Sequence, residues 1–538
     1  MKMLISVLIL GMLLTGCAPQ TPTATALPQP TAEPTATSVP VEVPWWKTAV
    51  FYEIFVRSFY DSDGDGIGDI NGMTSKLDYL NDGNPETKHD LGITAIWLMP
   101  IHPSPSYHGY DVLNYYGVNP EYGSMEDFKR FLAAAHERGI RVIIDLVLNH
   151  TSVRHPFFAS PSYRDWYIWS DTNSGAGWHD VSGSESSYYG YFCSCMPDLN
   201  YQNPDVTTQM NKVMAYWLES VGVDGFRVDA AKHLIEEDGG VNSQATHDWL
   251  KGYYTFYKSI NQAAYSVGEV SASDARLVST YTGDQFDQIF NFEMASGVVN
   301  SVKGEATSAI KSAVTFTMDD MPDWNFGTFL TNHDQDRVMS VLGGDVNKAK
   351  LAAFILLTSP GTPYIYYGEE IGMIGRKPDE FIRRPMQWSS EPGGGFSSSL
   401  AWEELDPGYV ESNVENQQMD EQSLLATYRD LIAIRQANPV LAVGAYVPVT
   451  SSNTGVYSFI RADGLNKVLV VVNLTKNSVT DFSLKALNTA IPDAEYPVAD
   501  LLTGEEGVPL LIQNGDFSDY QPVQILAPYE GRIFKIVE

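Results

Sequence analysis

Four apolar stretches of the sequence end in charged or polar side chains of the kinds that perform acid–base chemistry. In chain order these are Asp145 with Asn149 and His150, Arg227 with Asp229, Glu269, and His333 with Asp334. Any one of them alone is more simply a salt bridge or a cap at the end of a strand. Together they offer four carboxylates flanked by Arg and His, a set that can supply a nucleophile and a general acid/base. We therefore expect them to meet in one site.

The elements that would position these side chains form an alternating series. Eight short apolar segments predict strands, at residues 50–58, 93–100, 141–148, 223–228, 265–270, 285–290, 327–330 and 363–367. Helix-like segments lie between many of them, for example at 125–138, 207–220 and 346–358. Strands buried on both faces and alternating with helices predict an α/β fold, a (β/α)8 TIM barrel, in which side chains at the carboxyl ends of the strands share one mouth.

Two regions depart from this alternation. Residues 151–205 are rich in aromatic residues, Gly and Ser and follow the third strand, so they would overhang the active face of a barrel. Near residue 440 the pattern changes to short alternating strands, such as 456–460 and 468–472, which predict an antiparallel C-terminal β-sandwich. We therefore expect a barrel at 45–150 and 206–437, an insertion at 151–205, and a β-sandwich at 438–538.

The N-terminus has the features of a bacterial lipoprotein signal. Residues 1–16 contain Lys2 and an apolar run too short to span a membrane, and LTGC at 14–17 resembles a lipobox that would lipidate Cys17. The Thr/Pro-rich stretch 17–44 predicts an extended spacer. We expect an extracytoplasmic protein held at a bacterial membrane by its lipid anchor only. An ordinary signal peptide is the alternative.

The charge balance restricts the partners. The chain has 538 residues, with 34 Lys and Arg against 66 Asp and Glu, and a formal net charge of −32. Nucleic acids are excluded as partners because phosphate binding needs clustered Lys and Arg, and electrostatic docking on anionic lipid is disfavoured. A neutral substrate or a cation fits such a chain, and we expect a monomer.

Three cysteines, Cys17, Cys193 and Cys195, are too few for a disulfide scaffold. Cys193 and Cys195 are separated by one residue, which favours two free or loosely paired thiols, with a strained bridge as the alternative. We expect no zinc site, because no second Cys/His pair follows at zinc spacing.

An acidic loop near the N-terminus has the spacing of a calcium loop. Asp61, Asp63, Asp65 and Asp69 occupy relative positions 1, 3, 5 and 9, with the Ile67 carbonyl at position 7. Oxygen ligands at these positions suit Ca²⁺, although the position-12 Glu of an EF-hand is absent. A metal-free acidic turn is the alternative, but four Asp in nine residues repel one another without a cation.

Six motifs follow one another along the chain: HGYD at 108–111, DLVLNH at 145–150, MPDLN at 196–200, GFRVDAAKH at 225–233, GEV at 268–270 and FLTNHD at 329–334. They resemble the second-strand loop, the four core regions and the fifth region of glycoside hydrolase family thirteen, the α-amylase family. The resemblance covers about residues 45–538 and implies the barrel, with the insertion as the family's domain B.

The resemblance implies a retaining two-carboxylate mechanism. Asp229 would be the nucleophile, Glu269 the acid/base with a raised pKa, and Asp334 the carboxylate that holds the distorted sugar. Arg227 can keep Asp229 ionised from the same strand face. Tyr110 would stack on the sugar at the cleavage point. The full set of implied substrate-binding residues is Tyr110, His150, Arg227, Lys232, His233, His333 and Arg383.

Specificity is indicated by residues close to the nucleophile. Ala230 stands where members that favour α-1,6 bonds often have Val, and Lys232–His233 matches the α-amylase pattern, so both favour internal cleavage of α-1,4-glucans such as starch. RRPMQW at 383–388 instead resembles exo-acting α-glucosidases, and MPDLN lies between oligo-1,6-glucosidases and neopullulanases.

The chain therefore resembles an intermediary subgroup of the family. Exo-α-glucosidase and neopullulanase- or cyclomaltodextrinase-like activity stay open as alternatives. A non-catalytic sugar-binding protein on the same fold is the remaining class, and the presence of all three carboxylates argues against it.

The resemblance also bears on the cofactor, which we expect to be Ca²⁺. The acidic loop resembles the first βα-loop metal site of oligo-1,6-glucosidases. A second calcium is implied by the positions that bind one in many α-amylases, here Asn149, Asp198 and the backbone carbonyl of His233. Related branches of the family have lost that second ion, so the sequence leaves open whether this chain binds one calcium or two.

Overall fold

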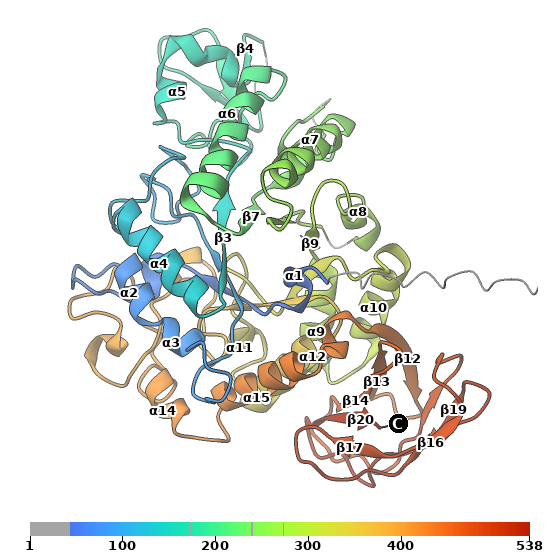
Figure 1. Ribbon diagram of the computed structural model, residues 1–538. Helices are drawn as coiled ribbons and strands as arrows, with labels where there is room; N and C mark the ends of the chain where they lie inside the picture. The colour runs from blue at the N-terminus through green and yellow to red at the C-terminus, as the bar shows by residue number, and fades with distance from the viewer. Residues whose placement is uncertain (1–42, 173–174, 238–239, 273, 538) are drawn as a thin grey trace, which may run out of the picture. The chain divides into compact units, whose positions relative to one another are not determined.

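The computed structural model describes residues 43–537 except 173–174, 238–239 and 273 (Figure 1). Its centre is a closed barrel in the order β1-β11-β10-β9-β8-β7-β3-β2, with every neighbouring pair parallel. The strands are β1 (Phe51–Ile54), β2 (Ala95–Leu98), β3 (Arg141–Leu146), β7 (Gly225–Val228), β8 (Tyr265–Gly268), β9 (Gln288–Phe290), β10 (Phe326–Phe329) and β11 (Thr362–Tyr366). Each overlaps one predicted segment, so the barrel is confirmed.

The helices that cover the barrel begin at residues suited to capping. Ser124 and Asp127 form a reciprocal capping box at the start of α4, and Ser243 and Ser423 cap α7 and α15. The long helices are α4 (Met125–Glu137), α6 (Pro204–Ala215), α7 (Gln244–Ile260), α9 (Phe292–Gly304), α10 (Ser308–Asp320), α12 (Val346–Thr358) and α15 (Leu424–Ala437). The end of the predicted helix at 207–220 is π-helical, as η3 (Tyr216–Val221).

Shorter helical turns fill the connections. They are α1 (Trp45–Thr48), η1 (Val56–Ser58), α2 (Ile70–Ser75), α3 (Leu77–Leu80), η4 (Ala231–His233), α8 (Ala275–Ser279), α11 (Val338–Val341), α13 (Asp379–Ile382), η5 (Pro392–Gly395), α14 (Val414–Gln418) and α16 (Val440–Val443).

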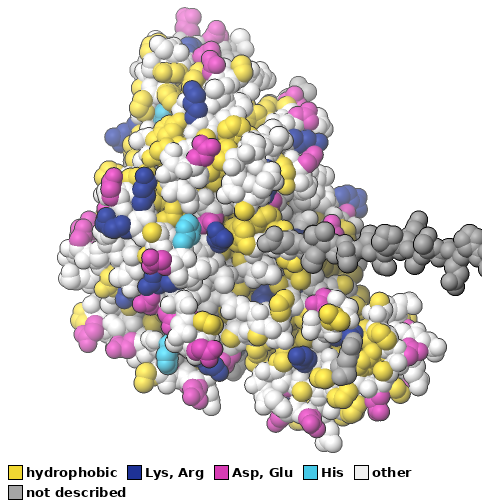
Figure 2. Space-filling model, in the orientation of Figure 1, with side chains coloured by type: hydrophobic (Ala, Val, Ile, Leu, Met, Phe, Trp, Pro, Cys, Tyr) yellow, Lys and Arg dark blue, Asp and Glu magenta, His cyan; other side chains and the backbone are white. Residues whose placement is uncertain are grey.

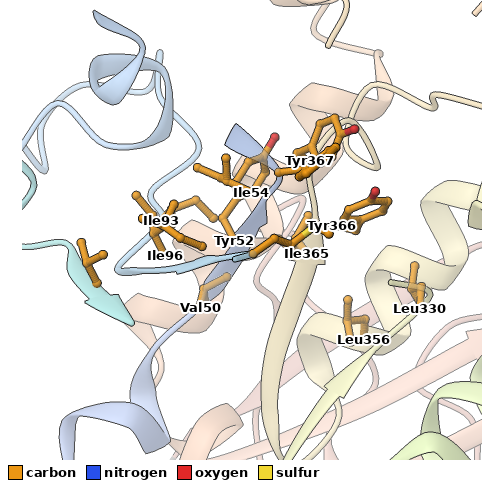
Figure 3. Packing of buried hydrophobic residues seen from close by; sticks show 14 of the residues in the cluster. Val50, Tyr52, Ile54, Ile93, Ile96, Leu330, Leu356, Ile365, Tyr366 and Tyr367 are labelled. Carbon is orange, nitrogen blue, oxygen red and sulfur yellow. The ribbon is translucent and has the colours of Figure 1, made fainter. Parts of the chain in front are cut away.

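The barrel strands are apolar on both faces because each face has its own core. Along β1, Tyr52 and Ile54 pack outward among residues such as Ile96 and Ile365, as Figure 3 shows. Phe51, which precedes Tyr52, points to the interior and stacks on Tyr364 with 4.4 Å between ring centroids. Alternate residues of a strand point to opposite faces, so two apolar cores produce the continuous apolar runs of the sequence.

The insertion after β3 forms a small domain with a sheet of its own. Its elements are α5 (Pro156–Ala159), η2 (Pro161–Trp166), β4 (Trp169–Ser170), β5 (Trp178–Asp180) and β6 (Ser187–Tyr189), with the antiparallel sheet order β4-β6-β5. Aromatic residues of the insertion contact one another. Phe158 stacks on Trp169 at 5.6 Å, and Trp178 lies 5.3 Å from Tyr189. Phe158 and Trp169 also pack against the main hydrophobic core, so the insertion is joined to the barrel by its aromatic residues.

The expectation of free thiols at Cys193 and Cys195 is wrong, because the two residues form a disulfide. The backbone N–H of Met196 donates to the Cys193 carbonyl at 3.1 Å, and this turn brings the two Cα atoms to 5.2 Å. That separation lies in the usual range for a disulfide.

The C-terminal region is the predicted antiparallel domain. Seven strands pair in the order β17-β20-β14-β13-β12-β15-β19, and β16 pairs with β18. Their bounds are β12 (Ala445–Ser451), β13 (Val456–Ala462), β14 (Lys467–Asn473), β15 (Leu484–Ala486), β16 (Ala494–Tyr496), β17 (Val498–Asp500), β18 (Leu510–Ile512), β19 (Phe517–Tyr520) and β20 (Gly531–Ile536). This domain has a separate apolar core that includes Ile460, Leu469 and Phe534.

The predicted signal sequence, Cys17 and most of the spacer lie outside the described residues. Among the residues that are described, no helix is long and apolar enough to cross a membrane. Asp and Glu side chains are scattered over the face shown in Figure 2 and do not gather in one patch. This distribution agrees with an acidic surface that mainly favours solubility.

Candidate active site

The carboxyl ends of β3, β7 and β8 bring three carboxylates around one buried guanidinium, that of Arg227. Its Nη1 donates to both oxygens of Asp145 at 2.8 Å and to Oδ1 of Asp229 at 2.9 Å, and its Nη2 contacts Oε2 of Glu269. The Arg227 side chain is only 1% exposed. Strand register explains the cluster, because Asp145 pairs directly with Arg227 and Glu269 follows the neighbouring strand.

Glu269 has the protonation behaviour that a general acid needs. Burial raises the pKa of Glu269 to about 7; the Arg227 guanidinium lowers it, and the negative charges of Asp229 and Asp334 raise it. A carboxyl with a pKa near 7 is substantially protonated at neutral pH and can give a proton to a leaving group. Glu269 is therefore suited to be the general acid of a two-carboxylate hydrolysis, and Asp229 lies beside it on the same guanidinium.

Asp334 completes the carboxylate set from the carboxyl end of β10. Its Oδ1 accepts a hydrogen bond from Arg383 Nη2 at 2.9 Å, and its Oδ2 lies 3.3 Å from His333 Nε2. Partial burial raises the pKa of Asp334, but His333, Arg383 and Arg227 outweigh this and hold it below its usual value. Asp334 is therefore ionised and can stabilise positive charge that develops on a substrate.

Tyr110 and His333 form one wall of the site. Their rings are stacked with 5.7 Å between centroids, and the Tyr110 hydroxyl lies 2.8 Å from His333 Nε2 and 3.1 Å from Asp145 Oδ2. His150 is buried near the same cluster, and burial lowers its pKa to about 4, so its imidazole is neutral. Tyr110, His150 and His333 thus lie together beside the carboxylates, and their contacts with a sugar stay predictions.

Two acidic residues of the site were not predicted from the sequence. Glu53, in β1, accepts a hydrogen bond from His333 Nδ1 at 2.6 Å, and Asp379 lies 3.1 Å from Arg383 Nη2. Glu53 could have been noticed as an acidic residue within an apolar strand, where a buried charge needs a partner. Asp379 gives no such signal, because it lies in a polar connection.

Arg383 is bound by protein acceptors within the site, and its contact with substrate stays a prediction. Its donors reach Asp334, Asp379 and the backbone carbonyl of His333, the last at 2.9 Å from Nε. These contacts make Arg383 a positioning residue for Asp334. A sequence motif identifies the arginine but does not show which acceptors lie within its reach.

Lys232 and His233 lie beside the central cluster. Lys232 Nζ donates to the carbonyl of Ser271 at 2.8 Å, and His233 Nδ1 lies 3.1 Å from Glu236 Oε1. The chain reaches them through Ala230, which has a left-handed backbone with φ 49° directly after Asp229. Such strain at a non-glycine residue is characteristic of functional sites.

The acidic loop brings three of its carboxylates together. One ligand oxygen from each of Asp61, Asp63 and Asp65 lies within 4.8 Å of the others. A hydrogen bond from the Asp65 amide lowers the pKa of Asp63, but burial and the negative charges of Asp65, Asp69 and Asp61 raise it above its usual value. A cation would relieve this repulsion, and the donor set fits Ca²⁺. The Asp69 carboxylate instead accepts hydrogen bonds from Ser62 and from the first turn of α2.

The residues implied for a second calcium also fit a cation. The side-chain oxygen of Asn149 is buried without a hydrogen-bond partner among the described residues. Burial raises the pKa of Asp198 well above its usual value, and a hydrogen bond from Asn149 lowers it only in part. An unpartnered buried oxygen beside a desolvated carboxylate suits an oxygen-ligated ion.

The chain is similar to characterised proteins over most of its length. The family model described as "Alpha amylase, catalytic domain" matches residues 53–444. Alpha-amylase 3 of Dictyoglomus thermophilum is 41% identical over 451 residues, which cover 80% of this chain and 86% of that protein. Oligo-1,6-glucosidase of Bacillus cereus is 30% identical over 582 residues, which cover 92% and 100%. The crystal structure of the alpha-amylase from H. orenii matches with a TM-score of 0.77 and 38% identity, covering 91% of this chain and 99% of that one.

Proposed function

The chain belongs to the α-amylase family of glycoside hydrolases, and from this we propose that it is a retaining α-amylase that cleaves internal α-1,4-glucosidic bonds of starch and maltooligosaccharides. The observation that carries the proposal is the cluster around Arg227, where Asp229 and Glu269 share one guanidinium and burial raises the pKa of Glu269. A two-carboxylate retaining hydrolase needs this pairing, with the carboxyls roughly 5–5.5 Å apart.

The proposed reaction has two steps, and Asp229 and Glu269 act in both. In the first, the Asp229 carboxylate attacks the anomeric carbon, the glycosidic C–O bond breaks, and Glu269 gives its proton to the leaving oxygen. In the second, the Glu269 carboxylate takes a proton from water, the resulting hydroxide displaces Asp229, and the anomeric configuration is retained. Asp334 stabilises the positive charge in both steps, and its contact with Arg383 fixes its position.

Endo-acting hydrolysis is favoured by the residues after the nucleophile. Lys232 donates to the carbonyl of Ser271, two residues after Glu269, and on this side of the site the continuing glucan chain would leave. The alternative is an exo-acting α-glucosidase, or a neopullulanase- or cyclomaltodextrinase-like enzyme. The similarity to the Bacillus cereus oligo-1,6-glucosidase over 92% of this chain supports that alternative.

We assign calcium a structural role. Asp61, Asp63 and Asp65 would hold one ion, with the Ile67 carbonyl as a further ligand, and Asn149, Asp198 and the His233 carbonyl would hold a second. Bound calcium supplies positive charge that neutralises these carboxylates, and no catalytic step needs it. Attachment through Cys17 to the outer side of a bacterial membrane completes the proposal, with the enzyme acting as a monomer.

Product analysis tests the mode of cleavage. Maltoheptaose blocked at its non-reducing end should be cleaved internally, releasing reducing fragments of several lengths. Release of glucose alone from unblocked maltoheptaose, with no attack on the blocked form, would replace the α-amylase proposal by the exo-α-glucosidase. Parallel assays on pullulan and cyclodextrin identify the neopullulanase-like alternative.

A further inference from the structure

The loop between β6 and α6 presents two exposed aromatic rings beside the active site. Tyr191 and Phe192 are 47% and 48% exposed, although large apolar rings are usually more buried. The Tyr191 ring lies 4.1 Å from the His233 imidazole, and the Phe192 ring lies 5.2 Å from His150 and 5.7 Å from His233. His150 follows β3, which carries Asp145, and His233 lies in the helical turn after Asp229, so the two rings border the active-site mouth.

A disulfide and backbone contacts fix this loop. The Cys193–Cys195 bond follows Phe192 directly in the chain. The backbone N–H of Val153 donates to the Cys195 carbonyl at 2.8 Å, and the Tyr188 hydroxyl donates to the Ser194 carbonyl at 2.6 Å. A binding loop held in one conformation loses less entropy when a ligand arrives. The two rings are therefore exposed and preorganised.

Glu269 identifies the side of the site on which the rings lie. The backbone N–H of Ala231 donates to the Glu269 carbonyl at 3.0 Å, and His233 lies two residues further along the same helical turn. A general acid stands on the side of the leaving group, because it protonates the leaving oxygen. The rings that contact His233 therefore border the leaving-group side.

We propose that Tyr191 and Phe192, held in place by the Cys193–Cys195 disulfide, form the platform on which the leaving-group glucose units of the α-glucan stack. This assignment rests on the proposed hydrolysis of α-glucans. The C–H faces of a glucose ring pack on aromatic planes, and a neutral substrate gains contact area there without a charged partner. The platform would favour long substrates over those with a small leaving group.

Two substrates separate the platform from the catalytic centre. Maltoheptaose has leaving-group sugars, whereas α-maltosyl fluoride has only fluoride. Three variants are compared with the wild type: Tyr191→Ala, Phe192→Ala, and the double variant Cys193→Ser/Cys195→Ser. Phe316→Ala is the matched control, because Phe316 is an aromatic residue of α10 that is 52% exposed. The measured quantity is the ratio of kcat/KM on maltoheptaose to kcat/KM on α-maltosyl fluoride.

We expect this ratio to fall by about tenfold in Phe192→Ala and in the double serine variant, and severalfold in Tyr191→Ala. It should not change in Phe316→Ala. Dithiothreitol provides a measurement that needs no substitution. It gives two electrons and two protons to the S–S bond, leaves two thiols, and is oxidised to its own cyclic disulfide. Treatment should lower the ratio in the wild type and have no effect on the double serine variant.

The outcomes distinguish the platform from the activity on which it rests. A wild-type enzyme that is active on both substrates, together with variants and reduced enzyme that keep the wild-type ratio, would overturn the platform alone. A folded wild-type enzyme that hydrolyses neither substrate would overturn the proposed function and the platform with it. Tyr191→Ala removes a surface ring and leaves the disulfide intact. If the double serine variant misfolds, the ratio measured for Tyr191→Ala still tests the platform.

Discussion

His333 Nδ1 lies 2.6 Å from Oε1 of Glu53, so the segment that follows β10 is joined to β1 inside the active-site cluster by a buried hydrogen bond between residues 280 positions apart. The other ring nitrogen of His333 faces the Tyr110 hydroxyl and Asp334. Burial lowers the pKa of His333, but Asp334 and Glu53 together raise it above its usual value. Glu53 therefore helps to keep a donor directed at the residues that would hold the substrate.

Replacement of this buried partner should impair catalysis. In Glu53→Gln the charge that stabilises protonated His333 is lost, the pKa of His333 falls, and kcat/KM on maltoheptaose should drop by about tenfold or more. Steady-state kinetics measure the effect, and Glu391→Gln, at an exposed position, is the control. Wild-type kcat/KM in a folded Glu53→Gln enzyme would contradict the role of Glu53.

The pH dependence should report Glu269. Glu269 must be protonated to act as an acid, and its pKa of about 7 means that kcat/KM on maltoheptaose falls as pH rises through about 7. With α-maltosyl fluoride the leaving group needs less protonation, so Glu269→Gln should lose far less activity on the fluoride than on maltoheptaose. Equal losses on the two substrates would argue against Glu269 as the general acid.

Replacement of Arg383 should move the acidic limb of the pH profile of kcat/KM to higher pH. Arg383 helps to hold the pKa of Asp334 below its usual value, so Arg383→Gln should raise that pKa. Activity that depends on ionised Asp334 is lost as pH falls through its folded pKa, and in this variant the loss should begin at higher pH. Arg376→Gln is the control, because Arg376 pairs with Asp336 at the surface. An acidic limb at the wild-type pH in Arg383→Gln would show that Arg383 does not lower the pKa of Asp334.

Calcium should stabilise the protein without entering the reaction. Addition of Ca²⁺ to chelator-treated enzyme should raise Tm, since a ligand that binds only the folded state stabilises it. Calorimetric titration should show tighter binding in the wild type than in Asp63→Asn, which removes an exposed ligand of the acidic loop, and Asp198→Asn tests the second site separately. Identical titrations for wild type and Asp63→Asn would exclude calcium from the acidic loop.

Much of the fold follows from sequence patterns because the barrel strands are buried on both faces. Segment 50–58 predicts β1, but the strand ends at Ile54 and the apolar run continues into η1. Apolar character reports burial, and it does not mark where the ladder of hydrogen bonds stops. Strand ends are therefore predicted less well than strands.

Within the site, the sequence identifies the carboxylates proposed to carry the chemistry but not the residues that support them. Asp229, Glu269 and Asp334 lie in recognisable motifs at strand ends. Glu53 and Asp379 act through His333 and Arg383, and such partners are set by the closure of the barrel and by loop paths. The sequence favours free thiols at Cys193 and Cys195 over the disulfide for a similar reason, since the bond depends on a local turn that spacing alone does not show.

The central claim is that Asp229 is the nucleophile of a retaining hydrolase, and trapping its glycosyl ester tests this most directly. The enzyme is incubated with 5-fluoro-α-maltosyl fluoride, digested, and analysed by peptide mass spectrometry. The structure predicts one added glycosyl group on the peptide that contains Asp229, and no adduct in Asp229→Asn. A stable adduct on Glu269 or Asp334, or near-native turnover of maltoheptaose by Asp229→Asn, would contradict the assignment.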